Sequence, residues 1–105
     1  MRTVEFRRLF DEQNAARVWF EIERNRVLRF VVQLECLFDD EWHPVVRYDT
    51  VHGFAHRDTI HPAGETDKTE MLVRDYNEAL TFAIRDLTRN WEKHRRRYEQ
   101  WLEQK

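Results

Sequence analysis

The strongest constraint on the fold is the alternation of apolar and polar side chains over residues 27–38, "VLRFVVQLECLF". Arg29, Gln33 and Glu35 occupy positions between six apolar residues: Leu28, Phe30, Val32, Leu34, Cys36 and Phe38. Because successive side chains of a strand point to opposite faces, this pattern predicts a half-buried β-strand. Residues 17–23, "RVWFEIE", repeat the pattern, and "RNR" separates the two segments, so we expect an antiparallel hairpin.

Further strands are predicted on both sides of this hairpin. The acidic turn "DDE" leads into "WHPVVRYDT", residues 42–50, where Pro44 favours an edge or a strand start. "FAHRDTI", residues 54–60, can form a fourth strand, and "VEFRRLF", residues 4–10, is interpreted as a fifth strand in preference to a short helix. "HPAGETDKTE", residues 61–70, clusters proline, glycine and polar residues and is predicted to be a loop.

The periodicity changes to that of a helix from about Val73 onward. Apolar and aromatic side chains recur at steps of three and four: Tyr76, Leu80, Ala83, Leu87, Trp91, His94, Tyr98 and Leu102. Since no proline interrupts them, they predict one long amphipathic helix over about 73–103. The expected fold is α+β, a single domain over residues 1–105: an antiparallel sheet of four or five strands over about 4–61, a loop over 61–70 and the C-terminal helix.

The length of this helix also predicts a partner. At about 1.5 Å per residue, the apolar stripe is on the order of 40 Å long. A small sheet is not expected to cover so long a face. We therefore predict that the C-terminal part packs against another chain, either a second copy in a homo-oligomer or a different protein.

Composition narrows the function classes. A formal net charge of −2 argues against a protein that coats nucleic acid by bulk charge. The charged first segment predicts no signal peptide, and no apolar run approaches the roughly 18 residues of a membrane span. The single cysteine suits a reducing compartment, so a cytoplasmic location is expected. The chain contains no serine, which sets serine hydrolase chemistry aside.

Residues that can carry chemistry concentrate in residues 47–61, "RYDTVHGFAHRDTIH". Alternation along a strand places His56 and Asp58 on one face and Arg57 on the other. A hairpin could therefore bring together five polar residues: Arg47, Asp49, His52, His56 and Asp58.

Three interpretations of this cluster remain open. In metal-free RNA cleavage, His52 and His56 would exchange protons, Arg47 or Arg57 would offset charge on the phosphorane, and Asp49 and Asp58 would complete the catalytic set. Alternatively, His52, His56 and His61 with an aspartate could bind a metal, but their spacing matches no usual zinc pattern, so neither a metal nor another cofactor is predicted. The third interpretation is structural: the polar groups satisfy one another across a sheet face.

The same segment resembles the TumE-like proteins, small partners in toxin-antitoxin pairs. Seven residues match the pattern of that family: Arg47, Tyr48, Asp49, His52, Gly53, His56 and Arg57. Thr50 and Asp58 depart from it, where asparagine and a further histidine are usual. The resemblance implies a toxin-like role, RNA as the target and a cognate antitoxin as the partner.

The predicted helix carries a basic stripe that could hold RNA. Five residues follow helical spacing: Arg85, Arg89, Lys93, Arg96 and Arg97. They are expected to bind phosphates near the histidines, or else to form only a solvated face. The alternative function is a non-catalytic interaction or regulatory module that docks a partner through this helix.

Overall fold

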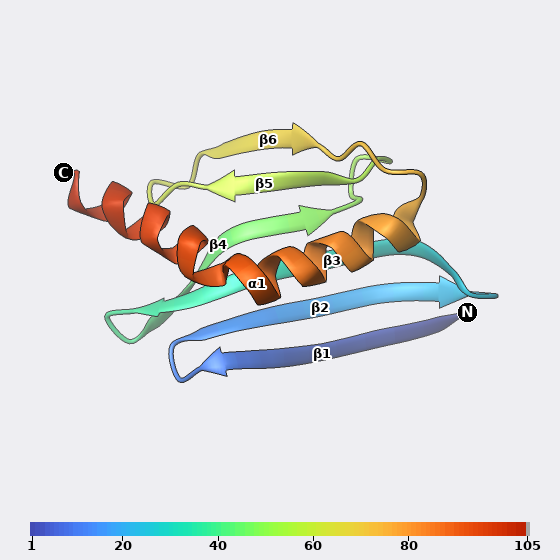
Figure 1. The fold of residues 1–105 in the computed structure, drawn as a ribbon, viewed down its shortest axis with the longest axis horizontal. Coiled ribbons are helices and arrows are strands. Elements are labelled where there is room, and N and C mark those ends of the chain that lie inside the picture. The colour runs from blue at the N-terminus through green and yellow to red at the C-terminus, as the bar shows by residue number, and fades with distance from the viewer. Residues whose placement is uncertain (105) are drawn as a thin grey trace.

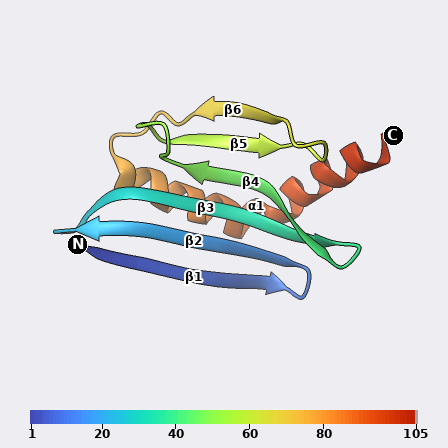
Figure 2. The ribbon, with the colours of Figure 1, turned by 180° about the vertical axis from the view of Figure 1, so that it is seen from behind.

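The computed structural model describes residues 1–104; Lys105, the last residue of the predicted domain, lies outside them. Within that range the chain forms six strands and one helix: β1 (Arg2–Asp11), β2 (Asn14–Glu23), β3 (Arg26–Phe38), β4 (Glu41–Asp49), β5 (His56–Ile60), β6 (Thr66–Glu70) and α1 (Tyr76–Glu103). Each strand pairs with the next in one open antiparallel sheet, and α1 crosses one face of it (Figure 1). The other face of the sheet, which is turned toward the viewer in Figure 2, carries no helix. The fold is α+β, as predicted, but the sheet has six strands where four or five were expected.

Strand β6 accounts for part of this difference, because it lies in the segment that was predicted as a loop. Only the first part of that segment turns: the His61 N–H donates to the Glu65 carbonyl at 2.8 Å, and Gly64 has a φ of 101°. The remainder pairs residue by residue with β5, although every residue of β6 is exposed. Since neither face of this edge strand is buried, no apolar alternation marks it in the sequence.

Two tight turns set the register of the long central strands. Arg24 and Asn25 have φ values of 50° and 64°, and Asp39 and Asp40 have values of 51° and 66°. Positive φ at both central residues is the geometry of the two-residue hairpin turn that matches strand twist. The hairpins predicted at "RNR" and "DDE" are confirmed.

The core lies between α1 and the sheet face that the helix crosses. Val32 and Leu34 of the sheet have no exposed area, and neither do Ala83 and Leu87 of the helix. Cys36 belongs to the same core, and burial raises the pKa of its thiol to about 12. This thiol is therefore a packing group and not a nucleophile.

Helix α1 begins at Tyr76, three residues later than predicted, because Asp75 caps it. The Asp75 side chain accepts a hydrogen bond from the Glu78 N–H at 2.8 Å, which satisfies one of the free donors of the first turn. The helix is kinked at Asn90, where φ is −125°. Within residues 1–104, no helix has the length and apolar composition that crossing a membrane requires.

Part of the C-terminal half of α1 packs on the chain itself, although its last turns project beyond the strands (Figure 1). Three of its aromatic rings stack on rings from the sheet and its turns, at centroid distances of 5.7, 5.4 and 3.9 Å: Trp91 on Phe10, Tyr98 on Phe38 and Trp101 on His61. At about 3.3 Å per residue, the longest strand spans roughly the length of the helix. The sheet therefore covers more of this face than was expected, and the packing of the C-terminal part against another chain stays a prediction.

Candidate functional site

The β4–β5 hairpin brings four of the predicted residues to the sheet face that α1 leaves open. Arg47 pairs with Asp58 and Asp49 pairs with His56 in the register of the two strands. Tyr48, between Arg47 and Asp49, points the other way and reaches the helix residue Asp86. Alternation therefore places Arg47, Asp49, His56 and Asp58 together on the open face, as the sequence predicted.

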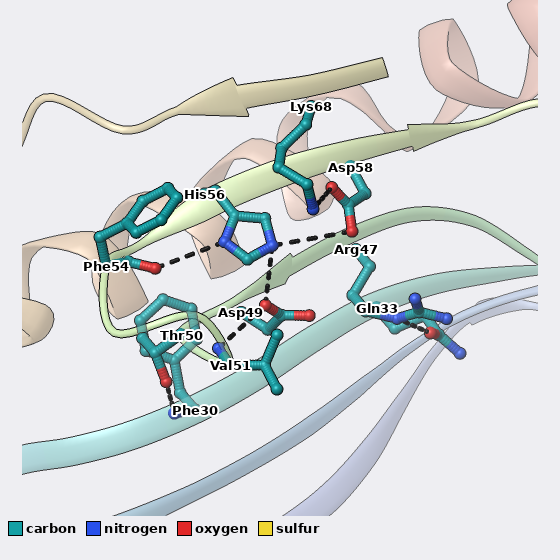
Figure 3. A network of polar contacts seen from close by, with 10 residues as sticks. All are labelled: Phe30, Gln33, Arg47, Asp49, Thr50, Val51, Phe54, His56, Asp58 and Lys68. Atoms are coloured by element: carbon teal, nitrogen blue, oxygen red, sulfur yellow. Dashed lines mark hydrogen bonds and ion pairs between the residues drawn. The ribbon is translucent and has the colours of Figure 1, made fainter. Parts of the chain in front are cut away.

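Three of these side chains form a buried cluster that we call the trio: Asp49, His56 and Asp58 (Figure 3). The His56 Nε2 atom lies 2.9 Å from Asp49 Oδ1 and 3.7 Å from Asp58 Oδ2. His56 has no exposed area, and each aspartate is only 6% exposed. The trio is thus secluded from solvent although no helix covers this face.

The turn between β4 and β5 provides the cover. Gly53 adopts a φ of 83° and its N–H donates to the Thr50 carbonyl at 3.0 Å, which closes the turn. The Thr50 hydroxyl accepts a hydrogen bond from the buried Phe30 N–H at 3.1 Å and so ties the turn to β3. Above the trio, the exposed His52 ring stacks on His56 with centroids 5.4 Å apart.

Two predicted residues lie away from this group. Arg57 faces the helix side of the sheet, beside Tyr48 and Arg97, and therefore cannot act together with the trio. His61 lies at the end of β5, where its Nε2 contacts Asp67 Oδ2 at 2.7 Å and its ring stacks on Trp101. A metal site built from His52, His56 and His61 is therefore excluded by position.

Two residues that the sequence did not indicate complete the neighbourhood. Lys68 of β6 donates to Asp58 Oδ1 at 2.8 Å, and Gln33 of β3 accepts from the Arg47 Nε at 2.8 Å (Figure 3). Lys68 lies in the polar segment taken as a loop, so its place opposite Asp58 follows only from the pairing of β5 with β6. Gln33 could have been found, because it lies on the polar face of the predicted central strand.

The basic stripe of α1 lies on the wrong face to serve these histidines. Four of its residues are exposed on the helix: Arg85, Arg89, Lys93 and Arg96. Arg97 is half-buried and faces Arg57; burial and that neighbouring charge lower its pKa. Because the sheet separates α1 from the trio, phosphates bound along the stripe would not lie near His52, contrary to the expectation.

A family model described as "Domain of unknown function (DUF7718)" matches residues 1–104. The chain belongs to this family. No curated protein and no solved structure matches it. The match covers all six strands and the helix, so the DUF7718 domain and the observed fold coincide. The description assigns no activity, and the resemblance to TumE-like proteins stays a prediction.

A second polar network joins this DUF7718 sheet to its helix. The Asp86 carboxylate accepts hydrogen bonds from the Tyr48 hydroxyl at 2.7 Å and from Asn90 Nδ2 at 2.9 Å, and it lies 2.8 Å from His94 Nε2. Burial alone would raise the pKa of Asp86, but the contacts with His94, Tyr48 and Asn90 outweigh it and hold that pKa well below its usual range. His94 is therefore a packed residue whose partner is Asp86.

Replacing Asp86 by asparagine is expected to lower the free energy of unfolding at pH 7 by about 2–3 kcal/mol, because buried donors lose a charged acceptor. A carboxyl group whose pKa is lowered by folding stabilises the folded state at pH values above its unfolded pKa of about 4. This stabilisation is lost as the pH falls from the unfolded pKa toward the folded pKa. Urea unfolding between pH 7 and pH 2.5 checks both points, and the difference between variant and wild type should shrink toward the acid end. A difference in the free energy of unfolding that does not change with pH would contradict a lowered pKa for Asp86.

Proposed function

We propose that this protein is a toxin-like protein that cleaves RNA at the turn between β4 and β5. The observation that supports the proposal is the pairing of an exposed imidazole with a buried one. His52 is open to solvent, and its ring stacks on His56, whose Nε2 lies 2.9 Å from the Asp49 carboxylate. Arg47 projects from the same sheet face and adds a positive charge beside them.

The burial of His56 divides the roles of the two histidines. Since His56 has no exposed area, only His52 can touch an RNA strand. In the proposed reaction, His52 takes the proton of a 2′-hydroxyl, the new O2′–P bond forms and the P–O5′ bond breaks, with the leaving oxygen taking a proton from water. Arg47 offsets charge on the phosphorane, while His56 and Asp49 position the ring that acts. The products are a 2′,3′-cyclic phosphate and a 5′-hydroxyl end.

Expression of matched variants tests this proposal. Cells that induce the wild type should grow slowly and accumulate RNA fragments with 2′,3′-cyclic phosphate ends. His52→Ala should restore growth and remove the fragments, whereas His43→Ala, which removes a histidine outside the site, should behave as the wild type. Equal growth of all three strains at equal protein levels, without fragments, would overturn the proposal.

A groove on the helix side supports a second candidate, a non-catalytic module that binds a partner protein. The cavity, of about 720 Å³, lies between α1 and strands β5 and β6, and its lining includes Met71, Leu72, Phe82, Arg57 and Arg85. Leu72 is 93% exposed and Phe82 is 50% exposed, so an apolar side chain has surface to bury there. Harmless expression of every variant above would favour this candidate.

A further inference from the structure

We infer that the trio of Asp49, His56 and Asp58 binds one divalent transition-metal ion. The proposal stands on the geometry of these side chains and holds whether or not the protein cleaves RNA. One atom from each residue can serve as a ligand, and these atoms all lie within 4.8 Å of one another. That spacing lets them share a single ion at the ligand distances of about 2.0–2.2 Å that nitrogen and carboxylate oxygen make.

The orientation of the His56 ring indicates a cation between its Nε2 atom and the two carboxylates. Its Nδ1 lies 3.3 Å from the Phe54 carbonyl, and because a carbonyl oxygen only accepts, this contact is a hydrogen bond when Nδ1 carries the hydrogen; the neutral ring then has its lone pair on Nε2. Nε2 then points at two aspartates, and although Asp49 Oδ1 is 2.9 Å away, the contact does not have the direction of a hydrogen bond. A fully buried lone pair that faces two carboxylates is repelled by them, and a cation between Nε2 and the carboxylates would remove that repulsion.

The partners of the two carboxylates hold them as ligands and leave room for this charge. Asp49 Oδ1 accepts the Val51 N–H at 3.2 Å, and Asp58 Oδ1 accepts Lys68 Nζ at 2.8 Å. Outer hydrogen bonds of this kind orient metal ligands in proteins. The two cations on this face are engaged elsewhere, since Lys68 pairs with Asp58 and the Arg47 Nε donates to Gln33, so within residues 1–104 Asp49 has no cationic side chain beside it other than His56.

The ligand set selects the class of ion. One imidazole and two carboxylates, with no thiolate, suit Zn²⁺, Mn²⁺ or Fe²⁺ and leave positions open for water or a substrate oxygen. The segment between the ligands is short, because β4 and β5 supply all three. An ion there would also pin the turn that presents His52, which stacks on His56.

Zn²⁺ titration of the full chain, freed of metal with EDTA and then dialysed, tests the inference. Isothermal titration should show one equivalent bound by the wild type, and Asp58→Asn should weaken the affinity at least about 100-fold, since loss of an outer partner alone costs 10–100-fold. Asp67→Asn is the matched control, because it breaks the His61–Asp67 pair on another part of the sheet. Its affinity should equal that of the wild type, and circular dichroism confirms that each variant is folded.

Nitrogen NMR of the wild-type imidazoles makes the test independent of any variant. Zn²⁺ should shift the Nε2 signal of His56 and leave its Nδ1 carrying hydrogen. Failure of the wild type to bind Zn²⁺ at millimolar concentration would overturn the inference, as would a Zn²⁺ affinity in Asp49→Asn and Asp58→Asn equal to that of the wild type. A His56 ring that carries hydrogen on both nitrogens at neutral pH and does not respond to Zn²⁺ would also overturn it, since a proton would then supply the charge.

Discussion

Replacing His52 by alanine is expected to lower the rate of RNA cleavage by the purified protein by about 10²- to 10⁴-fold, the usual contribution of a general acid–base group. His52 is the one member of the histidine pair that solvent, and therefore RNA, can reach. Its removal should leave the fold unchanged, because exposed substitutions usually shift the free energy of unfolding by less than about 0.5 kcal/mol. Initial rates on a single-stranded RNA oligonucleotide, with identification of the product ends, measure the effect.

The control for this prediction is His43→Ala, which should retain the wild-type rate because it removes a histidine outside the proposed site. His43 contacts the rings of Phe38 and Tyr98 and is remote from His52 along the sheet. Equal rates for the wild type and His52→Ala, with both proteins folded, would contradict a catalytic role for this ring. RNA cleavage by a contaminating ribonuclease would appear equally in the wild-type, His52→Ala and His43→Ala preparations.

Replacing Leu87 by alanine is expected to lower the free energy of unfolding by about 3–5 kcal/mol, the typical cost of a fully buried leucine that leaves a cavity. Leu87 has no exposed area and lies in the middle of α1 against the sheet. A domain of this size has a total stability of roughly 5–15 kcal/mol, so the variant should be marginal. The melting temperature should fall by about 12–40 °C.

Urea unfolding followed by circular dichroism measures this loss, and Arg89→Ala is the matched control. Arg89 is exposed on the same helix, so its replacement should change the free energy of unfolding by less than about 0.5 kcal/mol. A loss below about 1 kcal/mol for Leu87→Ala would mean that α1 does not dock on the sheet as observed.

Local patterns in the sequence predicted much of this fold. Alternation identified the strands over residues 17–23 and 27–38, and the period of three and four identified α1. These signals are strong because one face of each element is buried against the other, and burial selects apolar residues at the matching period. Strand β6 carried no such signal, since it is exposed on both faces and is held by backbone hydrogen bonds to β5.

The candidate site was predicted in part for the same reason. Alternation correctly grouped Arg47, Asp49, His56 and Asp58 on one face and separated Arg57 from them. It could not indicate that His56 would be fully buried, because the turn over residues 50–55 and Lys68 of the neighbouring strand β6, which carried no strand signal, supply that seclusion. The basic stripe of α1 was assigned to the wrong side, since helical spacing does not specify which face of a sheet a helix covers.

The sequence by itself determined which residues form strands and helix and which side chains share a strand face, because these follow from local periodicity and turn chemistry. Only the tertiary structure decided how far apart the groups lie and how deeply they are buried. Pairing between β4, β5 and β6 placed a buried imidazole 2.9 Å from one carboxylate and joined Lys68 to the other. Distances and burial of this kind depend on how separate strands pair and on how the turn between them folds over the site, which the periodicity of one segment does not specify.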